Sequence, residues 1–210
     1  MPLTAEQGEG MVRLARRSLD SFVSTQERPA ISRWEGYLVE KRGVFVTLKL
    51  SEPEGMNLRG CIGFPYPVKL LGDAIVEATI AAATEDPRFP PVKQSELTGI
   101  VVEVSALTRP EPIDVGGRKT RSEIPSAVRI GIDGLIVSAS PFQSGLLLPQ
   151  VAVEFNLKPT DFLTEACLKA GLPPDAWLLN GVSVQRFQAE VFEEERPRGK
   201  ARPVVFFKKG

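Results

Sequence analysis

The sequence has 210 residues, of which 42% are hydrophobic and 25% are charged, a composition that is typical of a folded globular protein and excludes wholesale disorder. Its 26 basic and 26 acidic residues balance, so the overall charge does not favour a polyanionic partner such as a nucleic acid over the whole surface. The chain contains no histidine, which excludes Ser-His-Asp and Cys-His catalysis within one chain and any zinc site that needs imidazole.

The two cysteines, Cys61 and Cys167, lie far apart and match no metal-binding spacing, so we expect no metal and no cofactor. Two free thiols in a chain of this size indicate a reducing compartment. The N-terminal segment lacks the continuous apolar core of a signal peptide, and no apolar run is long enough to span a bilayer. We therefore expect a cytoplasmic protein that does not associate with a membrane.

The first predicted element is a helix that begins after Thr4, because Thr4 and Gln7 have the spacing of a capping box. Apolar residues then recur at helical spacing and form one stripe: Met11, Leu14, Ala15, Leu19 and Phe22. The polar residues between them are expected to face solvent: Arg13, Arg16, Arg17 and Asp20.

Residues 43–50 alternate between apolar and polar positions and predict a half-buried strand. Residues 58–64 ("LRGCIGF") predict a second strand, antiparallel to the first. A helix follows with an apolar face through Leu71, Ile75 and Ala82, and it is expected to stop at Asp86-Pro87, because the residue before a proline avoids the helical region. Residues 99–107 predict a further strand.

Residues 109–126 are rich in proline, glycine and charge and are the best candidate for a lobe boundary. Residues 128–139 predict a hairpin with its turn at Asp133-Gly134. A helix is expected from Thr160, as N-cap, to Gly171, with Cys167 buried on it.

The C-terminal part predicts closing strands at 182–194 and 203–207. Acidic residues 193–195 and six basic residues between Arg196 and Lys209 are expected to form a solvated edge and tail. We therefore predict one domain over 1–195 and a basic tail over 196–210. Because the strands do not alternate regularly with helices, the fold class is α+β, a mainly antiparallel sheet flanked by helices.

Six motifs occur in an order that resembles the AMMECR-type family in its archaeal and bacterial form. They are "LRGCIG" (58–63), "EDPRFPPV" (85–92), "GIVVEVSAL" (99–107), "GIDGLIV" (131–137), "GLLLPQVAVEF" (145–155) and "ACLKAGLPPDAW" (166–177). The resemblance implies a compact α+β protein with a larger and a smaller lobe and no established activity. It also implies genes near those of radical-SAM-like and Memo-like proteins, hence a shared modification pathway. Asn156 departs from the family, which often has an aromatic residue there.

The "LRGCIG" motif is the first candidate site. On a regular strand Arg59 shares a face with Cys61, where its charge would stabilise a thiolate. The alternative for Cys61 is a buried strand cysteine. Gly60 and Gly63 indicate either a cleft in which the backbone meets an anionic group or close packing of the helix near 68–84.

Two further segments contribute candidate ligand-binding residues. Asp86 and Arg88 lie on a proline-stiffened loop that suits a binding edge, whereas Phe89 is expected to fill the core. Ser144 and Gln150 flank an apolar run, and the amide of Gln150 could contact a ligand.

Three functions follow from these residues. The first is a ligand-binding or accessory protein for a small anionic ligand or a protein partner, with a pocket near Arg59–Gly63, Arg88 and 144–150. The second is a cysteine-dependent enzyme with Cys61 as nucleophile and Arg59 as anion holder. The third is a nucleic-acid or regulatory adaptor that uses the basic tail.

Overall fold

The computed structural model describes residues 2–29, 33–53, 55–113 and 120–206, which form two compact units. The first unit contains the residues up to Leu107 together with Glu190–Val205, and the second contains Thr108–Ala189 and Phe206. The second unit is thus inserted into the first. Both units combine helices with a mainly antiparallel sheet, so the α+β fold class is confirmed.

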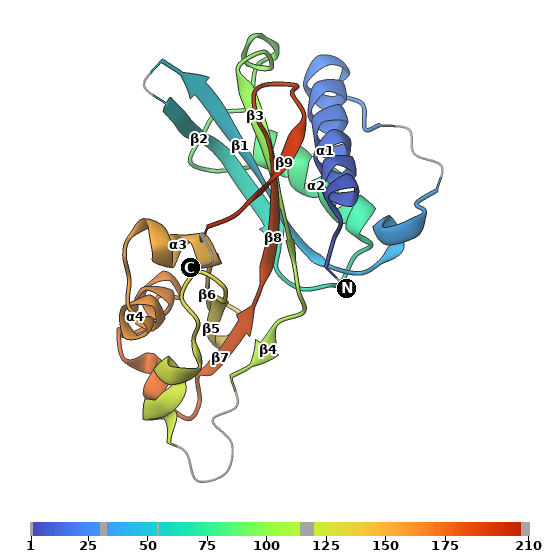
Figure 1. Ribbon diagram of the computed structural model, residues 1–210. Helices are drawn as coiled ribbons and strands as arrows, with labels where there is room; N and C mark the ends of the chain where they lie inside the picture. The colour runs from blue at the N-terminus through green and yellow to red at the C-terminus, as the bar shows by residue number, and fades with distance from the viewer. Residues whose placement is uncertain (1, 30–32, 54, 114–119, 207–210) are drawn as a thin grey trace. The chain divides into compact units, whose positions relative to one another are not determined.

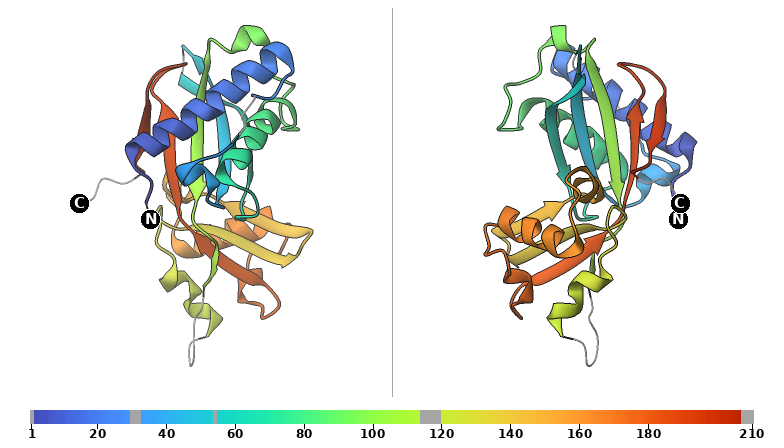
Figure 2. Two further views of the ribbon diagram at one scale, coloured as in Figure 1. Left: turned by 90° about the vertical axis from the view of Figure 1, so that its right-hand side faces the viewer. Right: turned by 60° about the vertical axis from the view of Figure 1, so that its left-hand side comes forward.

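The first unit is built on a five-stranded sheet in the order β2-β1-β3-β8-β9 (Figure 1). Its strands are β1 (Gly43–Glu52), β2 (Gly55–Phe64), β3 (Ile100–Leu107), β8 (Ala189–Glu194) and β9 (Ala201–Val204). Its helices are α1 (Ala5–Thr25), α2 (Leu71–Thr84) and the short 3-10 turns η1 (Gly36–Val39) and η2 (Gln94–Glu96). The two long helices pack against one another and against the sheet (Figure 2).

Alternation along β1 explains this packing. Val44, Val46 and Leu48 are fully buried and belong to the core that also includes α1 and α2. The residues between them project to the opposite face, because successive side chains of a strand point to opposite sides. As the sequence predicts, β2 is antiparallel to β1, and α2 ends before Asp86-Pro87. The capping box of Thr4 and Gln7 at α1 is also confirmed.

The second unit contains a four-stranded sheet in the order β4-β7-β5-β6. Its strands are β4 (Glu111–Pro112), β5 (Gly134–Ser140), β6 (Gln143–Leu147) and β7 (Ser183–Phe187). Its helices are α3 (Pro149–Glu154), α4 (Pro159–Lys169), η3 (Arg121–Ala127) and η4 (Ala176–Leu178). The helix α4 packs against the sheet through three buried side chains, Phe162, Leu163 and Cys167. They belong to a core that also contains Trp177.

The predicted hairpin over 128–139 is wrong. Residues 128–133 form a turn in which the Ile132 and Asp133 N–H groups both donate to the carbonyl of Arg129. Gly131, with φ of +62°, takes the left-handed conformation, and β5 begins only at Gly134 and pairs with β6 and β7. The aspartate stabilises the turn through its buried carboxylate, which binds Arg129.

Other expectations are corrected in detail. The N-cap of α4 is Lys158, with Pro159 in the first turn, rather than Thr160, whereas Gly171 does end the helix with φ of +71°. The last predicted strand, 203–207, is observed as β9 at 201–204, and residues 207–210 of the predicted tail lie outside the described residues. Because β9 belongs to the sheet, the segment after 195 does not begin as a free tail.

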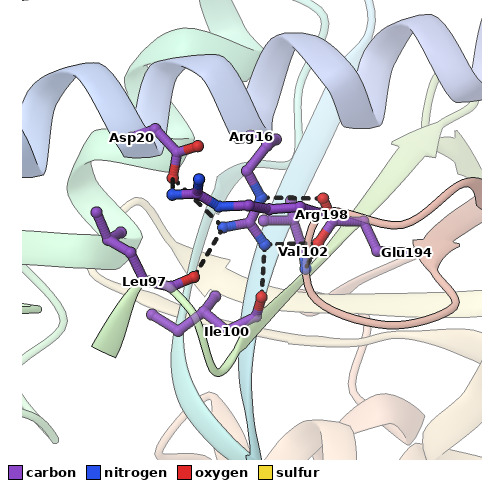
Figure 3. A network of polar contacts seen from close by, with 7 residues as sticks. All are labelled: Arg16, Asp20, Leu97, Ile100, Val102, Glu194 and Arg198. Carbon is purple, nitrogen blue, oxygen red and sulfur yellow. Dashed lines mark hydrogen bonds and ion pairs between the residues drawn. The ribbon is translucent and has the colours of Figure 1, made fainter. Parts of the chain in front are cut away.

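A buried ion pair between Arg16 and Glu194 joins α1 to the end of β8 (Figure 3). Arg16 Nε and Nη2 donate to the two carboxylate oxygens of Glu194 at 2.9 and 2.5 Å. Arg16 Nη2 also donates to the Ile100 carbonyl at 2.5 Å, and the Val102 N–H donates to Glu194 at 3.0 Å. Both residues were expected to face solvent, and both are instead buried.

At the outer side of this network, Asp20 lies 3.5 Å from Arg16 Nη1 and 3.2 Å from Arg198 Nη2. Arg198 has a left-handed φ of +60°, at the turn between β8 and β9. One basic residue of the predicted tail is therefore already engaged within the first unit.

Candidate functional site

The "LRGCIG" motif lies on β2, which is the outermost strand of its sheet. The pairing of β1 with β2 is regular from Val44 to Leu48, where Thr47 faces Cys61 and Leu48 faces Gly60. The register then shifts, so that Lys49 faces Leu58 and Arg59 is the extra residue of a β-bulge. The bulge breaks the regular alternation from which Arg59 and Cys61 were expected to share a face.

Arg59 binds Glu96 rather than the thiol. Its Nε and Nη2 donate to the two carboxylate oxygens of Glu96 at 2.6 and 3.1 Å, a bidentate pair that closes η2 onto β2. Only 10% of the Arg59 side chain is exposed. Its remaining nitrogen, Nη1, is buried and has no hydrogen-bond partner among the residues that the structure describes.

Phe89 lies beside two guanidinium groups. Its ring centroid is 5.9 Å from the guanidinium carbon of Arg59 and 5.5 Å from that of Arg88, distances at which cation–π attraction operates. The ring is only half-buried, and it is not part of the core cluster of the first unit. The expectation that Phe89 fills the core is therefore replaced by a contact with the two arginines.

Asp86 connects the motif to Arg88. One of its carboxylate oxygens accepts the Cys61 backbone N–H at 2.8 Å, and the two oxygens accept Nε and Nη2 of Arg88 at 2.9 and 2.7 Å. The Arg88 guanidinium holds the pKa of the Asp86 carboxyl well below its usual range, because its hydrogen bonds favour the ionised form against the effect of burial. Asp86 is buried, whereas 53% of the Arg88 side chain is exposed.

The Cys61 thiol is half-buried, and its Sγ lies 3.2 Å from the Thr47 hydroxyl, which donates to it. Burial raises the pKa of the Cys61 thiol, and this effect outweighs the Thr47 hydrogen bond and the charge of Arg88, which lower it. A raised pKa leaves the thiol protonated at neutral pH, the opposite of what an activated nucleophile needs.

Thr47 also stands opposite Glu103 on β3, so Cys61, Thr47 and Glu103 form a polar row across three strands. Beside this row Lys49 Nζ binds Glu103 at 2.7 Å and Glu193 at 2.6 Å. Burial acts to lower the pKa of Lys49, but the two carboxylates outweigh it and the net shift is upward. Lys49 therefore stays protonated at neutral pH and cannot serve as a general base.

Three residues around Cys61 were not predicted as site residues, namely Thr47, Lys49 and Glu103. The signal was present for Glu103, because it is the one charged residue in the mostly apolar strand 100–107 and is buried there. It was absent for Thr47 and Lys49, whose alternating strand places any polar residue on the face away from the core.

The two glycines of the motif are closely packed. A Cβ on Gly60 would lie 2.1 Å from the carbonyl oxygen of Ala82 in α2, and one on Gly63 would lie 2.2 Å from the carbonyl oxygen of Val44. The packing explanation that the sequence left open thus has direct support at Gly60. A contact of either glycine with a ligand stays a prediction.

Ser144 and Gln150 belong to the second unit, whereas all the other predicted site residues belong to the first. Ser144 is exposed on β6 and faces Ser138 of β5. Gln150 is buried on α3, and its side-chain oxygen accepts no hydrogen bond from the described residues. Their participation in one pocket with Arg59 and Arg88 stays a prediction.

In a Cys167→Ala background, we expect the rate at which iodoacetamide alkylates Cys61 to reach half its maximum at a pH above the free-thiol pKa of about 8.5. The reason is the burial that raises the pKa of this thiol. Thr47→Val should move the midpoint further upward, because it removes a hydrogen bond that lowers the pKa. The unfolded protein in urea provides the reference, and a native midpoint below that reference would contradict the expectation.

In the part of the chain that the structure describes, no helix combines the length and apolar character required to cross a bilayer.

Comparison with known proteins gives a consistent result. A family model described as AMMECR1 matches residues 12–192. A protein of Thermococcus onnurineus is 50% identical over 206 residues, which cover 95% of this chain and 97% of that protein. Protein PF1979 of Pyrococcus furiosus is 49% identical over 204 residues, which cover 95% of each chain.

The structure has a similar solved counterpart. The crystal structure of the uncharacterized protein PH0010 from Pyrococcus horikoshii aligns with a TM-score of 0.88 and 46% identity, covering 96% of this chain and 98% of that one. The family resemblance of the six sequence motifs is thereby confirmed.

Proposed function

This chain belongs to the AMMECR1 family, and from that premise we propose that it binds a small anionic ligand beside Cys61, with Arg88 as the cation that contacts the ligand. The observation that carries the proposal is the Asp86 carboxylate, which holds the Arg88 guanidinium and the Cys61 backbone together.

The two arginines near the motif differ in what they can offer. Arg59 is enclosed and its guanidinium is engaged by both oxygens of Glu96. Arg88 is bound by Asp86 along one edge only, and its side chain is half exposed. A guanidinium has five N–H donors, so the outer donors of Arg88 can bind a carboxylate or phosphate in fixed geometry. Arg59 then acts by holding η2 and Phe89 in place.

Binding is better supported than cysteine-dependent catalysis. The pKa of the Cys61 thiol is raised, and the nearby Lys49 stays protonated between Glu103 and Glu193. No histidine exists to take up a proton. A neutral thiol with a hydroxyl neighbour suits the wall of a binding site. A role beside a radical-SAM-like or Memo-like modification enzyme is compatible with a binding protein, and it rests on the family resemblance alone.

A nucleic-acid role of the basic segment has less support. Residues 201–204 form β9, and Arg198 is already close to Asp20. These contacts leave fewer free cations than the sequence suggests.

The proposal is tested by titrating the protein with sodium malonate and with sodium pyrophosphate, at constant ionic strength, while following backbone amide resonances. We expect saturable shifts of the Cys61 and Arg88 amides with at least one probe. Arg88→Ala should weaken binding by roughly tenfold or more, because it removes a charge-assisted hydrogen-bond donor.

Three variants control the titration. Arg17→Ala removes an exposed arginine from α1 and should leave the affinity unchanged. Arg88→Lys should retain part of it, and Cys61→Ser should retain nearly all of it. If Arg88→Ala binds as tightly as the parent protein, or neither probe binds at millimolar concentration, the proposal is wrong. Loss of probe binding in the Cys61→Ser variant alone would favour the hypothesis of a cysteine-dependent enzyme.

A further inference from the structure

The second unit contains a polar cavity of about 260 Å³ that involves none of the "LRGCIG" residues. Three segments surround it: the stretch that begins at Thr108 and leads into β4, the turn 129–133, and the end of β7. Each segment contributes one arginine, namely Arg109, Arg129 and Arg186. Three guanidinium groups at one small cavity repel one another unless negative charge is close by.

Asp133 supplies part of that negative charge, but it is already bound. Arg129 donates from its backbone N and its Nε to one carboxylate oxygen of Asp133, at 3.0 and 3.1 Å, and from Nη2 to the other at 2.7 Å. Asp133 is fully buried, whereas 53% of the Arg129 side chain is exposed. The aspartate therefore fixes and neutralises Arg129 while leaving its outer N–H groups accessible.

The other two arginines have unused donors. Arg186 donates from Nη1 to the Ala127 carbonyl at 3.2 Å, and it stands on β7 between Glu111 of β4 and Leu135 of β5. Arg109 is exposed and forms no hydrogen bond or ion pair with any residue that the structure describes. Glu111, the second carboxylate at the cavity, is exposed and forms no ion pair within that same set of residues. The cavity thus keeps a net positive charge.

Neutral donors complete the lining. The Thr108 N–H donates to the Gln188 carbonyl at 2.9 Å, and the Gln188 N–H donates to the Thr108 hydroxyl oxygen at 2.9 Å. These two bonds fix the crossing of the two chain segments. They leave the hydroxyl proton of Thr108 and the side-chain amide of Gln188 as further donors toward the cavity.

We propose that this cavity binds a tetrahedral oxyanion, a phosphate group that is either free or carried by a small molecule. Three arginines from three chain segments can each bind a separate oxygen of a phosphate, whereas one arginine fork suffices for a carboxylate. The volume is slightly below that of drug-sized pockets, so the ligand is small. This site is separate from the one proposed beside Cys61, since its lining residues all belong to the second unit.

Isothermal titration calorimetry with inorganic phosphate, at pH 7.5 and constant ionic strength, tests the proposal. The titration uses an Arg88→Ala background, which removes the cation proposed to bind an anion beside Cys61. In this background we expect saturable one-site binding that Arg109→Ala weakens by roughly tenfold or more. Arg109 has no partner to lose within the described chain, so this variant should fold normally. Arg17→Ala removes an exposed arginine of the first unit and should leave the affinity unchanged. Glycerol 3-phosphate, titrated in parallel, distinguishes a phosphomonoester from free phosphate as the preferred ligand.

Either of two results overturns the proposal: no saturable heat with millimolar phosphate or glycerol 3-phosphate, or equal weakening by Arg109→Ala and Arg17→Ala. Malonate binding tighter than both phosphates would replace the phosphate by a carboxylate ligand. Because the background lacks Arg88, the heats of phosphate and malonate report on this cavity and not on the site beside Cys61, so failure of the two sites is measured separately.

Discussion

Replacing Glu194 with glutamine is expected to lower the free energy of unfolding of the first unit by about 3 kcal/mol. It removes the buried carboxylate that pairs with Arg16 and leaves the partly exposed Asp20, 3.5 Å away, to balance the buried charge. The amide would also turn an N–H group toward the donors of Arg16 or Val102. Urea unfolding measures the effect. With Trp177→Phe as background, the fluorescence of Trp34 reports on the first unit alone, since Trp177 belongs to the second.

Two control variants distinguish the effect of removing a buried charge from the effect of removing any charge. Glu195→Gln makes the same chemical change at the exposed neighbouring position and should alter stability by less than about 0.5 kcal/mol. The double variant Arg16→Met/Glu194→Leu should cost less than the sum of the two single changes, because it removes both charges together. If Glu194→Gln is no more destabilising than Glu195→Gln, the buried pair does not contribute as inferred.

Gly60→Ala is expected to destabilise the first unit by about 3 kcal/mol, at the upper end of overpacking costs. The added Cβ would lie 2.1 Å from the carbonyl oxygen of Ala82, so β2 and α2 must separate. The clash is with a backbone atom, and truncating the Ala82 side chain should therefore give no rescue. Urea unfolding followed by circular dichroism gives the measurement.

Gly181→Ala is the matched control, because a Cβ at Gly181 meets no atom within 4 Å. It should change stability by less than about 0.5 kcal/mol. A Gly60→Ala protein as stable as the Gly181→Ala protein would mean that the helix and strand yield easily, and Gly60 would then be better explained by a ligand that approaches its backbone.

Local sequence patterns were sufficient to predict much of the fold. The alternation of β1, the capping box of α1 and the proline that follows α2 each depend on neighbours within a few residues. Such signals identify the element and its buried face, and together they indicated the α+β class correctly.

Local sequence patterns gave wrong predictions where the conformation or burial of a residue depends on a partner elsewhere in the chain. Arg16 has the spacing of a solvent-facing helix residue, but Glu194, its partner, lies 178 positions later in the chain. At Asp133-Gly134 the sequence suggested a tight turn between two strands. The buried pair of Asp133 with Arg129 instead stabilises a turn that precedes the strand.

The candidate site was predictable in its residue types more than in its geometry. Cys61, Asp86 and Arg88 are brought together as neighbours in the first unit. The role of Arg59 depends on one extra residue in β2, and a bulge of this kind changes the direction of a side chain without a clear sequence signal. The thiol environment also depends on Thr47 and Glu103, which come from two other strands.

The insertion of one unit into the other affects the order in which a ribosome can complete them. Residues 108–189 leave the ribosome as one continuous segment, so the second unit has nearly all of its parts before synthesis ends. The first unit cannot be completed until β8 and β9 have been synthesised. Before that point Arg16 lacks its buried ion-pair partner, Glu194. On a nascent chain, burial of α1 against the sheet should therefore be among the last folding steps, because it requires the final two strands to have been synthesised.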